Sequence, residues 1–395
     1  MPHETSLIAT IAVSLVFAFI GGFIAVRLHL PPQVGYLVAG IAAGPYTPGF
    51  VADATLAPQL AEIGVILLMF GVGMHFSVRD LWEVRAIALP GAVAQIAVAT
   101  AMGATVAIFW GWPLGAGLMF GLALSVASTV VLLRALEGQG RLYSDDGRIA
   151  VGWLIVEDLL MVLTLVLLPV FAGSLGNGAS SDNLPTTLGL TLGKIALFVT
   201  LMLVVGTRLF PWLLKQTERM GSRELFTLAV IALALGVAYG SAKFFGVSFA
   251  LGAFFAGVVI NESDLGHRAA TDLQSLQDAF AVLFFVAVGM LFDPLILQRQ
   301  PLQVLVVLMI IVVGKSLAAL GIVLVLRYPL GTALTVSAAL AQIGEFSFIL
   351  AGMGVTLRLL PPEGYNLILA GALLSITLNP LVFRFVSRAQ PAQAV

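Results

Sequence analysis

The stretch IAVGWLIVEDLLMVLTLVLLPV, from Ile149 to Val170, decides the architecture of this chain. As an α-helix it would be about 33 Å long, which is enough to cross the hydrocarbon core of a bilayer. Glu157 and Asp158 lie side by side near its middle, so both carboxyls are expected near the membrane midplane. A charge at that depth costs at least about 2.5–3.5 kcal/mol. We therefore expect both acids to face protein or water and to bind cations or carry protons.

The composition agrees with a membrane protein. Of the 395 residues, 60% are hydrophobic and only 10% are charged, against about 25% charged in a typical soluble domain. The chain has no cysteine, which excludes disulfides and thiolate metal sites. It also lacks a basic tract and a glycine-rich phosphate loop, so we expect neither nucleic acid nor a bound cofactor. No His or Ser stands beside the buried acids, which disfavours a hydrolytic enzyme.

Apolar runs separated by Pro- and Gly-containing turns predict an all-α polytopic membrane protein with about thirteen spans. No polar stretch is long enough for a soluble domain. We therefore expect a single transmembrane transport domain over residues 1–395, without a cytoplasmic nucleotide-binding domain. The predicted spans are 7–26, 32–44, 57–76, 86–108, 114–135, 148–170, 187–210, 224–240, 246–260, 278–292, 302–326, 331–354 and 364–386.

Basic residues are distributed unevenly between the alternate loops. If the N-terminus is outside, fourteen of the 19 Lys and Arg residues fall on the cytoplasmic side and three fall outside. The remaining two, Lys194 and Lys315, lie within spans. Because Lys and Arg mark cytoplasmic loops, we expect the N-terminus outside and the C-terminus in the cytoplasm.

Two strings recur at nearly constant spacing. FGVGMHF, which contains Gly73, is echoed 216 residues later by VAVGMLF, which contains Gly289. VGYLVAG, which begins at Val34, is echoed 213 residues later by VSFALGA. The offset carries a helix onto one seven spans later, and an odd shift reverses the orientation. The sequence therefore predicts inverted repeats, roughly 7–170 and 224–386, linked by the helix 187–210.

Two spans carry a polar interruption halfway along their length. They are SVAST, from Ser125 to Thr129, and QIGEF, from Gln342 to Phe346, and the 216-residue offset carries Ser128 onto Gly344. Such breaks let the backbone unwind where it lines a cavity. The candidate supporting ligands are Ser128, Thr129, Gln342 and Glu345, with Gly344 as the glycine of the unwound helix and Lys315 as the charge partner of the acids.

Together, the paired acids, the lysine, the interrupted helices and the thirteen spans resemble the monovalent cation:proton antiporter-2 superfamily. Within it the chain resembles the Kef-type potassium:proton antiporters, closest to the YbaL subgroup. The most specific strings are Gly152–Asp158, Gln342–Phe346 and Phe284–Met290. The resemblance covers nearly the whole chain and implies a sodium:proton antiporter-like fold with interrupted, crossing helices.

The resemblance also implies roles for individual residues. Asp158 takes the position of the ion-binding, proton-carrying acid, and Lys315 that of the basic residue on the eleventh span. Glu157 stands where relatives vary between Asp, Asn, Gln and Glu. Glu262 and Asp264 lie in a loop that resembles the one through which relatives contact a cytoplasmic regulatory domain or subunit. A homodimer in a bacterial inner membrane is expected from the family.

The resulting hypothesis is a secondary transporter that exchanges a monovalent cation for H⁺, with K⁺ as the first candidate and Na⁺ as the second. Cation and protons would compete for the oxygens of Asp158 and Glu157, and Glu157 would pair with Lys315 in the unloaded state. Alternating access would expose the site to each side in turn. The alternatives are a gated K⁺ efflux channel and an organic-anion symporter on the same fold.

Structural interpretations compete with some of these assignments. Glu157, Asp158 and Lys315 could form a purely structural ion pair, and Gly73 and Gly289 are interpreted as helix-packing sites. Gln342 and Glu345 are three residues apart, so on a helix they would share a face. An interhelical hydrogen bond and ion ligation are both open for that pair.

Overall fold

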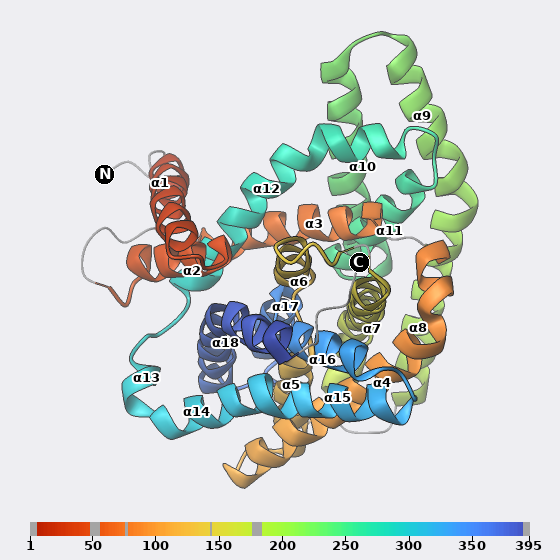
Figure 1. Ribbon diagram of the computed structural model, residues 1–395. Coiled ribbons are helices and arrows are strands. Elements are labelled where there is room, and N and C mark those ends of the chain that lie inside the picture. Colours follow the sequence, from red (N-terminus) through yellow and green to blue (C-terminus); the bar gives the residue numbers. More distant parts are fainter. Residues whose placement is uncertain (1–5, 48–55, 76–77, 143, 176–183, 390–395) are drawn as a thin grey trace. The chain divides into compact units, whose positions relative to one another are not determined.

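A computed structural model describes residues 6–47, 56–75, 78–142, 144–175 and 184–389. Every regular element in these ranges is helical (Figure 1), as the apolar runs predict. In chain order the helices are α1 (Ser6–Arg27), α2 (Pro32–Ala43), α3 (Ala57–His75), α4 (Val78–Phe109), α5 (Leu114–Ser125), α6 (Thr129–Glu137), α7 (Asp145–Leu175), α8 (Leu184–Leu201), α9 (Thr207–Arg219), α10 (Arg223–Gly240), α11 (Phe249–Asn261), α12 (Gly266–Met290), α13 (Ile296–Arg299), α14 (Pro301–Met309), α15 (Lys315–Val325), α16 (Leu330–Ala339), α17 (Glu345–Thr356) and α18 (Pro362–Ala389).

The thirteen predicted spans all correspond to helical segments within these ranges. Ten helices in the described part of the chain are long and apolar enough to cross a membrane, and shorter apolar helices accompany them. Three π-helical turns join α8 to α9, extend α10 and join α14 to α15. The two interrupted spans are divided into α5 and α6, and into α16 and α17, as predicted.

The predicted limits were wrong where a helix continues beyond its apolar run. The tenth span was expected to begin at 278, but α12 begins twelve residues earlier, at Gly266. The seventh was expected to end at 210, but α9 continues to Arg219. Hydropathy marks only the part of a helix that suits hydrocarbon, whereas backbone hydrogen bonds continue through its polar ends.

The chain divides into two units, each built from separated segments. Unit 1 contains residues 1–20, 36–76 and 164–291, and unit 2 contains residues 21–35, 77–163 and 292–395. Each unit therefore combines helices from the N-terminal and C-terminal halves of the chain. An inverted repeat predicts this, because equivalent helices of the two copies serve the same unit.

Within unit 1, glycines bring helix backbones into direct contact. A Cβ on Gly73 would overlap the Phe254 carbonyl of α11, and a Cβ on Gly257 would overlap the Phe70 carbonyl of α3. Gly40 of α2 and Gly289 of α12 form an equivalent contact, since a Cβ on either would strike the partner's backbone. The interpretation of Gly73 and Gly289 as helix-packing sites is confirmed. We call these four residues the glycine crossing.

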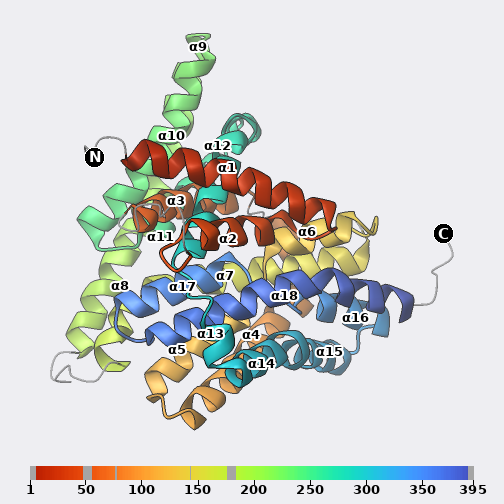
Figure 2. The same cartoon turned by 90° about the vertical axis from the view of Figure 1, so that its left-hand side faces the viewer.

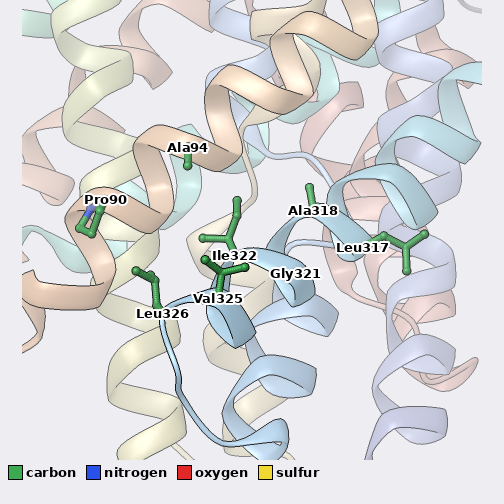
Figure 3. A pocket seen from close by; sticks show the side chains of 8 residues that line it. All are labelled: Pro90, Ala94, Leu317, Ala318, Gly321, Ile322, Val325 and Leu326. Carbon is green, nitrogen blue, oxygen red and sulfur yellow. The ribbon is translucent and has the colours of Figure 1, made fainter.

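Within unit 2, α4 packs against α15 (Figures 1 and 2). The two helices are antiparallel, because Gly314 lies beside Met102 whereas Leu326 shares a groove with Pro90. This groove has a volume of about 480 Å³ (Figure 3). It has no polar lining side chain, as expected of a surface that faces lipid tails. Its lining residues are Pro90, Ala94, Leu317, Ala318, Gly321, Ile322, Val325 and Leu326.

Candidate cation site

Two extended backbone segments interrupt the helices of unit 2. Residues 126–128 separate α5 from α6, with φ −91° and ψ 132° at Val126 and φ −87° and ψ 120° at Ser128. Residues 340–344 separate α16 from α17, and Gly344 is also extended, with φ −118° and ψ −166°. The Ser128 hydroxyl caps α6 by accepting from the Val131 N–H. Each break leaves helix-terminal N–H and C=O groups inside the protein, where they need partners.

The polar groups of the two breaks form hydrogen bonds with each other. The Gly344 N–H donates to the Val126 carbonyl at 3.3 Å. The Gln342 side chain accepts from the Ser128 N–H and donates to the Ser128 carbonyl, both at 3.1 Å. A Cβ on Gly344 would lie 2.6 Å from the Ser128 Cα, so only glycine allows this approach. We call residues 126–128 and 340–344 the polar crossing.

Gln342 does not lie where the sequence predicted, and its side chain is hydrogen-bonded to backbone. It does not share a helical face with Glu345, because it lies in the break and Glu345 begins α17. Its amide bonds to the Ser128 backbone, which is the interhelical hydrogen bond considered as one alternative. Gln342 therefore holds the crossing together.

Asp158 lies on α7 beside this crossing. Its Oδ2 accepts a hydrogen bond from the Thr129 hydroxyl at 3.0 Å. The side chain is 6% exposed, whereas Glu157 is fully buried. Glu345 and Glu157 are its charged neighbours, and both repel a negative Asp158. The geometry brings a buried carboxylate and a hydroxyl together, and hard cations prefer oxygen ligands of this kind.

Glu157 contacts the same break through a backbone N–H. Its Oε2 accepts from the Ala127 N–H at 3.0 Å. Its Oε1 is also buried, and the Trp153 side chain of the same helix lies beside the carboxylate. A fully buried carboxylate needs such polar neighbours when it is charged.

Lys315 supplies the positive charge in this layer. It is fully buried, and its Nζ donates to the Gln342 carbonyl at 3.0 Å. No direct ion pair joins it to Glu157 in the described structure, although the two charges interact through space. A π-helical turn, Ile310–Gly314, immediately precedes it. Such turns are rare and occur frequently at functional sites.

Glu345 is the third acid of the layer. It is 4% exposed, and its Oε2 accepts from the Ser128 hydroxyl at 3.0 Å. As the first residue of α17 it also lies where the helix dipole favours negative charge. Ser128 therefore serves both breaks, with its backbone bonded to Gln342 and its hydroxyl to Glu345.

The predicted site residues of the membrane layer all meet in unit 2. Asp158 contacts Thr129, Glu157 contacts the first break, Lys315 contacts the second, and Ser128 joins the two. Within the described ranges, no three His, Cys, Asp or Glu side chains converge as a metal cluster. A cation held here would therefore also need hydroxyl or carbonyl oxygens.

The predicted regulatory loop lies elsewhere, in unit 1. Asp264 is 83% exposed and forms an ion pair with Lys215 of α9 at 2.9 Å. The hydrogen bond and charge of Lys215 lower the pKa of the Asp264 carboxyl below its usual value. Glu262 is exposed in the same loop.

Sequence reasoning missed two polar residues that support the crossing. Gln95 of α4 is fully buried and donates to the Ser125 carbonyl at the end of α5, at 3.1 Å. Asn379 of α18 is buried and donates to the Ala338 carbonyl near the end of α16, at 3.0 Å. Both are isolated polar residues inside apolar spans. The rule that singled out Glu157 and Asp158 would have found them.

The family model described as "Sodium/hydrogen exchanger, transmembrane" matches residues 15–389. The chain belongs to this family. It is also 60% identical over 389 residues to the "Putative cation/proton antiporter YbaL" of Escherichia coli (strain K12). That match covers 98% of this chain and 70% of the relative. The resemblance inferred from the site residues is therefore confirmed.

More distant relatives agree with this membership. The chain is 33% identical over 385 residues to "K(+) efflux antiporter 4" of Arabidopsis thaliana, covering 97% of this chain and 64% of the relative. The fold matches the sodium proton antiporter NhaP1 of Methanocaldococcus jannaschii with a TM-score of 0.73 at 16% identity, over 97% of this chain and 99% of that one. The predicted sodium:proton antiporter-like fold is confirmed.

Proposed function

We propose that this chain is a secondary antiporter that exchanges a monovalent cation for H⁺, with Asp158 as the residue that carries each in turn. The observation that supports this most is the Asp158–Thr129 pair beside the polar crossing. It places a buried carboxylate against a hydroxyl at the start of α6, next to the break between α5 and α6. Cation and proton compete for the same carboxylate, and this competition couples their movements.

Glu157 and Lys315 set the charge of the layer in this proposal. Glu157 and Glu345 disfavour a second negative charge at Asp158, whereas Lys315 favours negative charge on Glu157. When Asp158 binds a cation, this repulsion is relieved. When the cation leaves, a proton takes its place. Exchange is electrogenic if Glu157 also releases its proton and electroneutral if Glu157 retains it.

K⁺ is our first candidate for the transported cation and Na⁺ is the second. The plant relative named as a K(+) efflux antiporter supports K⁺, and the archaeal structure named as a sodium proton antiporter supports Na⁺. The charges of the site residues do not determine which cation is preferred, because K⁺ and Na⁺ both bind oxygen ligands. Selectivity between them depends on cavity geometry.

Further features of the assembly follow from the same proposal. We propose one transport domain of two inverted repeats, with the N-terminus outside and the C-terminus in the cytoplasm. We also propose a homodimer in a bacterial inner membrane. We assign the loop that contains Glu262 and Asp264 to contact with a cytoplasmic regulatory partner.

Proton flux in proteoliposomes tests the transport proposal. Purified protein is reconstituted with a pH-sensitive dye inside, the membrane potential is clamped, and K⁺, Na⁺ or Li⁺ is added. We expect cation-dependent proton flux that Asp158→Asn reduces at least 100-fold. Asp145→Asn is the matched control, because Asp145 lies on the same helix with its side chain 87% exposed. Full flux in Asp158→Asn, or a tracer K⁺ leak without proton movement, would overturn the proposal, and the leak would favour a channel.

A further inference from the structure

The groove between α4 and α15 is formed by residues of unit 2 alone. Pro90 and Ala94 line it from α4, and the other six lining residues come from α15 and its C-terminal end (Figure 3). Its volume of about 480 Å³ is within the range of ligand pockets, roughly 300–1,000 Å³. All eight lining residues are apolar, so the groove suits a hydrocarbon chain.

The repeat shows which substitutions leave this space open. The offset of 216 relates the second half of α4 to α15 and carries Met102 onto Ala318 and Thr105 onto Gly321. At both positions the groove has the smaller residue of the pair. A Cβ on Gly321 would meet no atom within 4 Å. The small residues of α15 therefore leave room for a ligand along the helix.

Two exposed arginines lie at one end of the groove. The membrane-crossing stretch of α4 begins at Val84, and the stretch that includes α15 ends at Val325. Because the two helices are antiparallel, these limits are at the same end of the unit. Arg85 directly follows the first limit, and Arg327 follows the second by two residues. Both arginines therefore lie where the apolar groove meets the polar edge of the spans.

Arg85 is held at this edge by Trp82. Its guanidinium donates to the Trp82 carbonyl and lies over the Trp82 ring, 4.1 Å from the centroid. Trp82 is 64% exposed, and exposed tryptophans are typical of the membrane–water interface. A guanidinium has five N–H donors, so Arg85 keeps donors for a phosphate group. Neither Arg85 nor Arg327 forms an ion pair with another residue that the structure describes.

Arg327 occupies a backbone conformation that favours glycine. Its φ is 63°, and the residue 216 positions earlier is Gly111, with φ 88°. The surrounding strings are also equivalent, since GWPLG begins at Gly111 and RYPLG begins at Arg327. A side chain is strained in this conformation, and residues held in it cluster at functional sites. The turn needs only glycine, so the arginine side chain indicates a function of its own.

We propose that this groove binds an anionic phospholipid, with an acyl chain between α4 and α15 and the phosphate held by Arg85 and Arg327. Basic sites between spanning helices on the cytoplasmic side bind anionic headgroups, and this end of unit 2 is cytoplasmic in the proposed orientation. The lipid stabilises the packing of two helices whose buried residues, Gln95 and Lys315, support the polar crossing. Lipid binding does not depend on the proposed cation exchange, so the two proposals fail separately.

Thermal unfolding of the purified protein in detergent tests the headgroup contacts. Phosphatidylglycerol or phosphatidylcholine with the same acyl chains is added, because a ligand that binds the folded state raises the unfolding midpoint. We expect phosphatidylglycerol to act at about tenfold lower concentration than phosphatidylcholine. Arg327→Gly and Arg85→Gln should each raise the half-saturating phosphatidylglycerol concentration about tenfold. Without lipid, the Arg327→Gly midpoint should be unchanged or higher, since glycine suits the turn.

Arg358→Gly is the matched control for Arg327→Gly. Arg358 is also an exposed arginine of unit 2 with a positive φ, 55°, but it does not line the groove. This change removes the same charge and relieves the same backbone conformation, so we expect a wild-type response to phosphatidylglycerol. An equal loss of response in the two variants would overturn the inference.

Gly321→Leu tests the acyl-chain contact separately. It fills the groove and keeps both arginines, so we expect it to raise the half-saturating phosphatidylglycerol concentration about tenfold as well. Gly236→Leu is its control, because a Cβ on Gly236 also meets no atom within 4 Å and Gly236 lies in unit 1. Equal stabilisation of the wild type by the two lipids, or a wild-type response in Arg85→Gln, Arg327→Gly or Gly321→Leu, would overturn the inference.

Discussion

The glycine crossing of unit 1 and the polar crossing of unit 2 bring backbone segments into close contact in different ways. In unit 1, continuous helices approach through Gly40, Gly73, Gly257 and Gly289, and the backbone hydrogen bonds remain within each helix. In unit 2 both helices are broken, and the free backbone groups bond to the opposite break or to buried side chains. The first arrangement needs no polar side chain at the contact, whereas the second depends on several.

The glycine crossing is a packing contact, whereas the polar crossing has groups that suit the proposed cation site. Backbones that touch through glycine exclude water and leave no group free to bind an ion. Broken helices expose N–H and C=O groups that attract acids and a lysine, as Glu157 does at Ala127 and Lys315 does at Gln342. A cation needs oxygens that the helices have not already used, and for this reason we propose the polar crossing as its site.

The largest effect is expected for the buried lysine of the polar crossing. Lys315→Met removes a buried positive charge and the donor to the Gln342 carbonyl. Lys315 and Glu157 interact through space, and leaving a buried charge without its compensating partner costs about 3–5 kcal/mol. We therefore expect destabilisation of that size in the unfolding of the detergent-solubilised protein. The double variant Lys315→Met/Glu157→Gln should recover more than half of the loss. Equal stability of the single and double variants would show that the two charges are not coupled.

A somewhat smaller effect is expected for Gln342→Ala. This change leaves the Ser128 N–H without a partner, and the Ser128 carbonyl then accepts only from the Leu132 N–H. An unsatisfied buried group costs about 1–3 kcal/mol, so we expect a loss of about 1–3 kcal/mol, measured in the same unfolding experiment. Gln303→Ala is the control in the same unit, because its Oε1 is already without a partner. Similar losses in the two variants would contradict a special role for the crossing.

The glycine crossing should respond to added volume rather than to lost charge. In an open helix Gly→Ala stabilises by about 1 kcal/mol, but at Gly73 the new Cβ would overlap the Phe254 carbonyl. We expect Gly73→Ala to destabilise by about 1–3 kcal/mol and Gly236→Ala to be neutral or stabilising, since no atom lies within 4 Å of its new Cβ. Thermal unfolding of both variants compares them, and equal midpoints would rule out close packing at Gly73.

The smallest effect is expected outside both crossings. Lys215→Gln should return the pKa of Asp264 towards its usual value, which carboxyl NMR titration measures. A carboxyl with a lowered folded-state pKa stabilises at neutral pH, and this contribution is lost as the pH falls through that pKa. Because the pair is exposed, we expect almost no change in the unfolding midpoint at neutral pH. A large change would mean that Asp264 has a further structural role.

Much of the polar crossing could be predicted from the chain. Charged and amide residues inside apolar spans are costly, so Glu157, Asp158, Lys315 and Gln342 identified the layer and the two breaks. The partners of these groups could not be predicted, because they lie up to 214 residues away in the sequence. The ion pair expected between Glu157 and Lys315 illustrates this, since a backbone N–H and a carbonyl are their hydrogen-bond partners instead.

The amino-acid sequence is enough to predict the membrane class, the thirteen spans, the repeat and the family. The bilayer requires every segment that crosses it to have a certain length and to be mainly apolar, and both properties can be read from the sequence. The folded chain was needed to show that Gln342 bonds to Ser128 and that Asp158 accepts a hydrogen bond from Thr129. These properties depend on contacts between distant segments, and the energy of a buried polar group is set by the partner that packing brings to it.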